Sequence, residues 1–564
     1  MDDTGRPSLA PHRLSGSGPG TVKGNAGVSL VMLAVGGFLL AFSFAGVGAG
    51  SPGRSDPTLV KRGGTLMLAG SLGVGSLDPA LLSSPRAGAL ASATCARLFN
   101  DPDAAGSAGA RVIPEVVRTY GISRDGKTYT FDLKRSFKFH TGQPVTARSF
   151  ADAFDRVANP KLRSPLLGSG YIDQIVGAKA VLAGKATRIS GVRVLGRYRL
   201  QIRLTKVLPD LLARLTLGYF CPIPRNTPIE SNGIDSPPGS GPYYVAEQIV
   251  NRIVLERNPY YSGGRPANVD RITYRFMSDE ACLLATERDE IDLCLQPLWD
   301  TDTWQQLAHR YRKRVFATPT LETWFVVFNH DRRAFSGRGQ IPLAKAINYA
   351  IDRPALVRAL PVRVGRATDQ MLPPALGRNE RIYPVAGADP RNARRWLRKA
   401  KYRPRRLVLY WPNGGSEATQ SIKDDLKRIG IDVEVRLFGV GEHFAKIGTR
   451  GEPFDLAFDA WSPDWADGAA FFVPLASGTS LRKTGNSNAS YFNDPRVNAR
   501  IRAAGPKRGK ARRDAWADLD VGLMRDNPPW APFFNTVVRE FVSKSFGCYV
   551  NHFGLVDLVA ACKK

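Results

Sequence analysis

The sequence lacks the short motifs that mark several common classes of enzyme and metal site. It has no Gly-x-Ser-x-Gly and no His-Glu-x-x-His, so typical signatures of hydrolases and zinc proteases are missing. It also has no Cys-x-x-Cys, which argues against a zinc or thiol-redox site. A nickel site would favour clustered histidines, but the six histidines are far apart: His12, His140, His309, His330, His443 and His552. We therefore expect no enzyme activity, no cofactor and no metal site.

Cysteine is scarce, with six residues in 564. An even number of cysteines in an exported chain permits disulfide bonds. Two pairings, Cys282 with Cys294 and Cys548 with Cys562, would close short loops, and Cys95 with Cys221 would close a long one. The sequence leaves the connectivity open.

Negative charge is under-represented, since 50 acidic residues face 79 lysines and arginines and the net charge is +29. Nucleic-acid binding is one interpretation of such a chain. We find no nucleic-acid-binding motif and interpret the basic residues as scattered, so we expect no nucleic-acid partner. The charge then keeps a surface protein soluble or holds it near an anionic envelope.

Long apolar runs are absent apart from Val28–Gly50, which follows a leader rich in Gly, Ser and Pro over residues 1–27. We expect that leader to be disordered. About 20 apolar residues can span a bilayer. The small residues at 47–49 fit a secretory cleavage site after Ala49, whereas the long leader fits an uncleaved anchor. Both alternatives place the rest of the chain outside the cytoplasm, and no cysteine ends the run to carry a lipid.

A chain of this length exceeds a single core, and its hydrophobic fraction of 43% is that of a folded protein. Tyr129, Phe131 and Leu133 alternate with polar residues after an Asp-Gly turn, which predicts a half-buried strand. Thr146 is a suitable N-cap for the helix that follows. These patterns indicate mixed α/β structure in two or three domains.

A β-α-β unit is predicted further along the chain. Leu407–Tyr410 has the pattern of a short strand, Ser416 can cap a helix, and Ile431–Leu437 alternates as a second strand. Such a crossover is right-handed in nearly all proteins and implies parallel strands.

The stretch Phe454–Gly468 carries the main candidate site. Phe454, Leu456 and Phe458 are predicted on one face of a strand, and Asp455 and Asp459 on the other. The strand then ends in Trp461-Ser-Pro-Asp-Trp465. Ligands of α/β proteins bind outside the carboxyl ends of strands, so two indoles and a carboxylate there indicate a binding site.

With these segments in view, the chain resembles family 5 of the extracellular solute-binding proteins, the oligopeptide- and dipeptide-binding components of ABC importers. Its closest agreement is Val112–Glu115 followed by Ser123–Phe131 and Phe137–Ala147. Three more runs agree in the family's order: Gly239–Tyr244 with Leu255–Pro259, Ala346–Arg353, and Trp461–Asp467. The agreement covers roughly residues 61–556.

The resemblance implies an α/β fold of the two-lobe, periplasmic-binding-protein-like type II, a clamshell with an inserted accessory α+β domain. Lobe I would comprise residues 61–95, 201–319 and 531–564, with the accessory domain at 96–200 and lobe II at 320–530. Residues 28–50 would be the signal or anchor segment.

The resemblance also implies the binding residues. In peptide-binding members an Asp after a strand-end Trp pairs with the peptide's amino terminus, and Trp461 and Asp464 match these two. A turn-capping role is the alternative for Asp464, and core packing for Trp461. Ala460 and Ser462 would offer backbone groups to an extended ligand. Ala460 stands where many members have Gly, and Trp465 where many have Tyr, which leaves the ligand open.

The function implied is a monomeric, non-catalytic protein outside the cytoplasm that captures a small solute, foremost a short peptide, and delivers it to ABC permease subunits. The alternatives are a nickel complex, haem or sugar as ligand, or an exported protein of this fold that acts as a hydrolase.

Overall fold

The computed structural model describes residues 62–71, 73–104, 109, 111–164, 170–360, 364–552 and 554–564. The leader and the apolar run Val28–Gly50 lie outside these residues, so the expectations for them stay predictions. Over the ranges that are described, no helix has both the length and the apolar character needed to cross a membrane.

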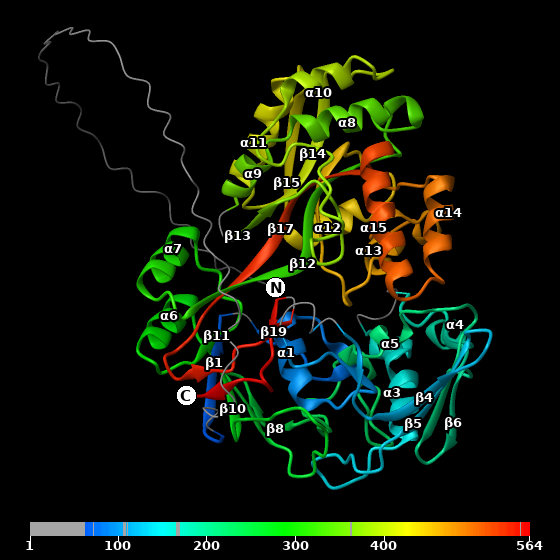
Figure 1. Ribbon diagram of the computed structural model, residues 1–564, viewed down its shortest axis with the longest axis vertical. Helices are drawn as coiled ribbons and strands as arrows, with labels where there is room; N and C mark the ends of the chain where they lie inside the picture. The colour runs from blue at the N-terminus through cyan, green and yellow to red at the C-terminus, as the bar shows by residue number, and fades with distance from the viewer. Residues whose placement is uncertain are drawn as a thin grey trace, which may run out of the picture. The chain divides into compact units, whose positions relative to one another are not determined.

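A five-stranded sheet forms the first layer, in the order β11-β1-β10-β9-β8 (Figure 1). β1 runs parallel to β10 and β11, whereas β10, β9 and β8 are antiparallel neighbours. Leu66 and Leu68 of β1 are fully buried in a core that also contains four alanines of helix α1. The elements are β1 Thr65–Gly70, α1 Pro85–Thr94, β8 Tyr243–Ile249, β9 Arg252–Arg257, β10 Arg271–Phe276 and β11 Leu293–Cys294.

A separate four-stranded antiparallel sheet, β4-β5-β7-β6, contains the predicted alternating strand. Tyr129, Phe131 and Leu133 all point into one core with helix α3, so the period-2 prediction is confirmed. Thr146 is the N-cap of α3 and forms a capping box with Ser149. The elements are β4 Val117–Ile122, β5 Thr128–Leu133, α3 Ala147–Val157, α4 Ala178–Leu182, β6 Val192–Gly196, β7 Arg199–Arg203 and α5 Leu211–Arg214.

The third sheet has six strands in the order β13-β17-β12-β16-β14-β15. Its two long strands, β12 and β17, are far apart in sequence but pair antiparallel, drawn green and red side by side in Figure 1. Register shifts interrupt that pairing at Pro319 and near Trp324. The strands are β12 Val315–Phe328, β13 Val364–Ala367, β14 Arg406–Pro412, β15 Asp432–Phe438, β16 Leu456–Trp461 and β17 Trp530–Phe541.

Helices cover both faces of this six-stranded sheet. One face packs against α8 Ile341–Ala350, α9 Arg353–Arg358, α10 Pro390–Leu397 and α11 Ser416–Lys427. The other packs against α12 Val440–Ile447, α13 Ala469–Ala476, α14 Pro495–Ala504 and α15 Gly509–Asp526. A sheet covered in this way is buried on both sides in its interior, so strand β16 lacks a solvent face.

The predicted β-α-β unit is present as β14, α11 and β15, and its two strands are parallel with Leu407 opposite Val433. The predicted cap is wrong: Gly415 is the N-cap residue, and no side chain caps this helix. Gly430 follows α11 with a φ of 86°, a left-handed conformation that glycine adopts without strain.

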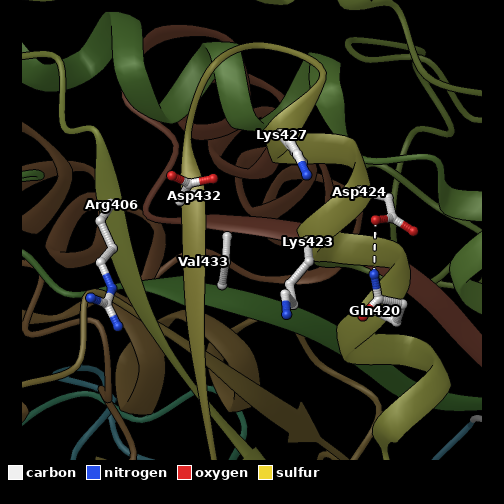
Figure 2. A pocket seen from close by; sticks show the side chains of 7 residues that line it. All are labelled: Arg406, Gln420, Lys423, Asp424, Lys427, Asp432 and Val433. Atoms are coloured by element: carbon white, nitrogen blue, oxygen red, sulfur yellow. Dashed lines mark hydrogen bonds between the residues drawn. The ribbon is translucent and has the colours of Figure 1, made fainter.

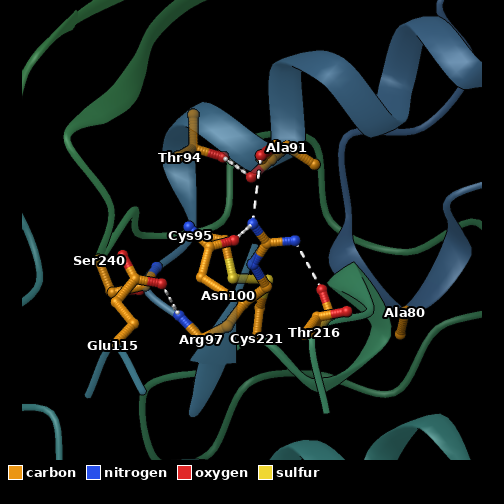
Figure 3. Close-up of a disulfide and its surroundings, with 12 residues drawn as sticks. Ala80, Ala91, Thr94, Cys95, Arg97, Asn100, Glu115, Thr216, Cys221 and Ser240 are labelled. Carbon is orange, nitrogen blue, oxygen red and sulfur yellow. Dashed lines mark hydrogen bonds between the residues drawn. A yellow bond between two sulfur atoms is a disulfide. The ribbon is translucent and has the colours of Figure 1, made fainter. Parts of the chain in front are cut away.

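Three disulfides join Cys95 to Cys221, Cys282 to Cys294, and Cys548 to Cys562. The first links the end of α1 to a segment 126 residues later. Figure 3 shows Arg97 beside it, where the guanidinium donates to the carbonyl of Thr216 at 2.6 Å and the backbone N–H to Glu115 at 2.8 Å. The disulfide and the Arg97 guanidinium thus hold the same two distant segments together, the one after α1 and the one around residues 216–221.

Remaining helices and strands are short and lie mainly in the disulfide-linked segments. Helix α6 Asp279–Glu287 follows β10 in sequence, and helix α7 Thr301–Arg310 follows the two-residue strand β11. The paired short strands are β2 Phe99–Asn100 with β3 Ile113–Pro114, β18 Phe546–Gly547 with β21 Cys562–Lys563, and β19 Asn551–His552 with β20 Leu555–Val556. The lobe and accessory-domain boundaries given above stay predictions.

Candidate functional site

The candidate site follows strand β16, an interior strand of the six-stranded sheet. β16 pairs antiparallel with β12 and parallel with β14. Leu456 and Phe458 pack on the α8–α11 side, but Phe454 precedes the strand and packs on the opposite side, so the prediction of one shared face is wrong for Phe454. Because both faces are covered, Asp455 and Asp459 are buried rather than solvated.

Ala460 and Trp461 form the last two positions of β16. Ala460 lies opposite Trp324 of β12, and its N–H donates to the carboxylate of Asp459 at 2.8 Å. The indole N–H of Trp461 donates to the carbonyl of Ala470 at 2.8 Å, and the half-buried ring packs against the α13–α15 core. Trp461 therefore ties the strand end to helix α13.

Ser462 and Asp464 are the exposed residues of the turn. The Asp464 carboxyl reaches solvent, yet protein surrounds it closely enough that burial raises its pKa to about 6, with a hydrogen bond from its own backbone N–H opposing that shift. Over the described part of the chain, no cation forms an ion pair with Asp464. An accessible carboxylate in such surroundings is suited to accept an ammonium group, because a charged partner would replace lost hydration.

Trp465 is buried, and its ring contacts two residues from a distant part of the chain. The Tyr171 ring meets it edge-on, with centroids 5.2 Å apart, and the Arg214 guanidinium lies 4.8 Å from its centroid. Within the described residues, the indole N–H of Trp465 has no hydrogen-bond acceptor.

A chain of alternating charges continues from this turn. Arg512 of α15 donates to both carboxylate oxygens of Asp467, at 2.7 and 2.9 Å, and lies 3.9 Å from Asp210. Asp210 in turn accepts from Arg214, the residue over Trp465, at 3.1 Å. The turn after β16 is thus joined to α5 by ionic and aromatic contacts.

Sequence reasoning selected Asp464, Trp461, Ser462 and Ala460, which the structure places together because they are consecutive. Trp465 was included there as the second indole but was given no binding role of its own, and its contacts Tyr171 and Arg214 were not predicted. No pattern in the sequence relates residues 171 and 214 to residue 465, so only the fold brings them together. The roles of the four selected residues stay predictions.

Two more ionisable side chains lie under the strand end. Burial raises the pKa of Asp459 to about 7, and the hydrogen bond from Ala460 opposes that shift. His443 is fully buried, its Nε2 contacts the Phe458 carbonyl at 2.9 Å, and burial lowers its pKa. Both groups are therefore held toward their neutral forms.

A protein site for a metal ion needs several His, Cys, Asp or Glu side chains close together. Across the described ranges, no three of them come together in a way that could hold a metal ion. His140, inside one of the resemblance motifs, stacks on Tyr244 and accepts from the Gly239 N–H at 3.1 Å, which are structural contacts.

Known proteins share both sequence and fold with this chain. Residues 111–482 match the model of the bacterial extracellular solute-binding proteins, family 5. The nickel-binding periplasmic protein of Escherichia coli is 26% identical over 60% of this chain and 65% of its own length. The periplasmic oligopeptide-binding protein OppA of Escherichia coli is 25% identical over 66% of this chain and 70% of its own.

Among solved structures, the clavulanic acid biosynthesis oligopeptide binding protein 2 superposes with a TM-score of 0.80 at 23% identity, covering 89% of this chain and 96% of that one. This likeness establishes the predicted α/β, two-lobe fold of the periplasmic-binding-protein type. The family model spans 372 of the 564 residues, well over half of the chain. The chain therefore belongs to family 5 of the bacterial extracellular solute-binding proteins.

Proposed function

We propose that this protein captures a short peptide between its two lobes and delivers it to the permease subunits of an ABC importer. It would act as a monomer outside the cytoplasm, without catalysing a reaction. Family membership supports the solute-binding role, and the names of the similar OppA and of the solved oligopeptide-binding protein support a peptide as the solute.

One observation carries the choice of a peptide. Asp464 is an accessible carboxylate at the end of an interior strand, with its pKa raised and with no cation paired to it among the described residues. The amino terminus of a peptide is a cation that would complete this site. Ala460 and Ser462, on either side of Trp461, would lie along the ligand.

A nickel complex is the second candidate ligand, since a similar protein is named for nickel binding. Such a complex would need donors from its own chelator, because no metal-binding group of side chains forms within the residues described. Haem and sugars have no specific support in this site.

Native mass spectrometry of protein purified from its own cells tests the ligand class. A ladder of co-purifying peptides is expected. A single metal complex, or another small molecule at full occupancy, would contradict a peptide-binding role.

Titration calorimetry with the variant Asp464→Asn tests the site. This change removes the ammonium's partner but keeps the side-chain shape, so affinity for peptides with a free amino end should fall about 10- to 100-fold. Amino-acetylated peptides should lose little affinity. Asp235→Asn, at an exposed loop position, is the matched control. Equal losses for free and acetylated peptides would remove the proposed role of Asp464.

A further inference from the structure

A dense group of basic residues lies on helix α10 and on the segment that directly follows it. Between residues 391 and 406 the sequence has nine cations and no acid, whereas the whole chain has 79 cations in 564 residues. All nine are exposed. The earlier interpretation of scattered basic residues is therefore wrong for this segment. We call it the α10 patch; its members are Arg391, Arg394, Arg395, Arg398, Lys399, Lys401, Arg403, Arg405 and Arg406.

Few of these charges are neutralised inside the protein. Among the described residues, only Arg406 of the nine forms an ion pair, with Glu434 at 2.6 Å. Arg394 and Arg403 donate to the backbone carbonyls of Arg428 and Arg398, which leaves their positive charge uncompensated. Like charges held this close repel one another, so the patch is arranged for an anionic partner rather than for stability.

Two hollows border the α10 patch, and three cations line each. The first has a volume of about 420 Å³ between β14, β15 and α11, where Arg406, Lys423 and Lys427 accompany Asp424 and Asp432 (Figure 2). In Figure 2 both lysines lie on the α11 side of this hollow, opposite the strands that carry Arg406 and Asp432.

The second hollow has a volume of about 270 Å³ and is lined by Lys345, Arg381 and Arg525 together with aromatic rings that include Trp396 of α10. No carboxylate lines it. Groups of three cations around a recess suit phosphate oxygens, which accept several charged hydrogen bonds at once.

The aromatic rings of the patch are already covered by the protein's own cations. The ammonium groups of Lys345 and Lys399 each lie 4.6 Å from the centroid of Trp396, and the Arg333 guanidinium lies 4.3 Å from that of Tyr402. Binding of single-stranded nucleic acid relies on aromatic faces that stack on bases. Such faces are not offered here, so the patch favours a surface of phosphates over a strand of bases.

The α10 patch is separate from the solute site. Ala393 anchors α10 in the core on one face of the six-stranded sheet, whereas Trp461 packs in the core on the other face. A partner on the patch would therefore leave the turn at Asp464 free to bind solute.

We propose that the α10 patch docks this protein on the surface of an anionic phospholipid membrane. The choice of a membrane rests on the proposed function, which places the protein beside a membrane permease. It also agrees with the apolar run Val28–Gly50 in the same sequence. Clusters of lysine and arginine bind anionic bilayers, each residue near the surface contributing about fivefold in affinity at low screening.

Vesicle co-sedimentation of the full chain tests the proposal. The vesicles are phosphatidylcholine alone or phosphatidylcholine with phosphatidylglycerol. The patch variant replaces Arg391, Arg395, Arg398 and Arg405 by Gln, because none of these four side chains has an ion pair or hydrogen bond within the described residues. The control variant replaces Arg124, Lys161, Lys185 and Arg193 by Gln, four exposed cations in the segment of the four-stranded sheet.

The affinity of the patch variant for the phosphatidylglycerol vesicles should fall at least tenfold, because four cations are removed from the contact surface. The affinity of the control variant should fall about twofold or less, because salt screens the attraction between distant charges and the membrane. All proteins should bind neutral vesicles alike, since the apolar run is common to them. Equal losses in both variants, or no preference of the unaltered protein for phosphatidylglycerol, would overturn the proposal.

A duplex DNA and a single-stranded DNA serve as competing polyanions. Binding to DNA that falls in the patch variant while vesicle binding is unchanged would replace the membrane by nucleic acid and overturn the proposal. Peptide affinity by calorimetry should be the same in all three proteins. If no peptide binds, the proposed function fails while the vesicle comparison still decides whether the patch binds membranes.

Discussion

Two parts of the molecule are held together by different means. Residues 62–314 and 542–564 contain all six cysteines, joined in three disulfides. Residues 315–541 have no cysteine, and their six-stranded sheet lies between two large apolar cores. We call these the disulfide-linked part and the cysteine-free part.

The difference follows from how each part buries its apolar side chains. The disulfide-linked part divides its buried residues among several clusters around smaller sheets, and cross-links restrict its unfolded chain. The cysteine-free part covers both faces of one sheet, so burial alone supplies most of its stability. Under reducing conditions the unfolding free energy of the disulfide-linked part should fall, and that of the cysteine-free part should stay the same.

The largest expected effect comes from removing the long-range disulfide. The double change Cys95→Ser, Cys221→Ser opens a loop of 126 residues, which should cost about 4–5 kcal/mol of the unfolding free energy by chain entropy. In urea denaturation the transition of the disulfide-linked part should move to lower urea concentration, and the transition of the cysteine-free part should not move. The double change at Cys548 and Cys562, 14 residues apart, should cost about 3 kcal/mol. Identical shifts of every transition would show that the two parts unfold together.

A cavity in the core of the cysteine-free part should lower the stability of that part alone. Leu409 of β14 is fully buried, so Leu409→Ala should cost about 3 kcal/mol. Leu437→Ala is the control, since that leucine of the neighbouring strand is 44% exposed and should cost little. Denaturation with and without a reducing agent separates the two parts. A shift of the disulfide-linked transition by Leu409→Ala would contradict the comparison.

The ionic contacts between the two parts should have a smaller effect. Arg512→Gln leaves Asp467 and Asp210 without their shared cation, and we expect a loss of about 2 kcal/mol in unfolding free energy. Peptide affinity should fall as well, because Asp467 fixes the turn that carries Asp464. Arg513→Gln changes the exposed neighbour and should be neutral. Matching results for the two variants would mean that the Asp467 pair is unimportant.

The smallest expected effect is a pH dependence of binding. The Asp464 carboxyl has a pKa raised to about 6, so it is mostly neutral at pH 5 and mostly ionised at pH 7. An ammonium ligand needs the ionised form. Affinity for peptides with a free amino end should therefore fall about tenfold from pH 7 to pH 5. Amino-acetylated peptides should show a flat profile in the same calorimetric series, and a parallel fall for them would assign the effect to another group.

Local patterns in the sequence predicted much of the fold. Strands β14 and β15 and the helix between them follow from apolar spacing alone, as does the buried face of β5. Phe454 was misplaced because alternation was extended beyond the start of β16. Asp455 and Asp459 were expected on a polar face, but their strand is covered on both sides, which no pattern within that strand reveals.

The candidate site was predictable only where it is contiguous. Asp464 and its neighbours were found because they follow one strand, whereas Tyr171 and Arg214 reach Trp465 through the tertiary fold. The α10 patch shows a different limit, since its nine cations are consecutive enough to be seen in the sequence. Their exposure and lack of acidic partners, which make them a surface, required coordinates.

The contacts of Trp465 give the protein a built-in optical reporter. Its indole lies against a guanidinium and a phenol ring that belong to a remote stretch of the chain. Any separation of these groups would hydrate the ring and move its fluorescence to longer wavelength. The difference between the spectra of the unaltered protein and of Trp465→Phe would then follow opening and closing in real time, without an added dye.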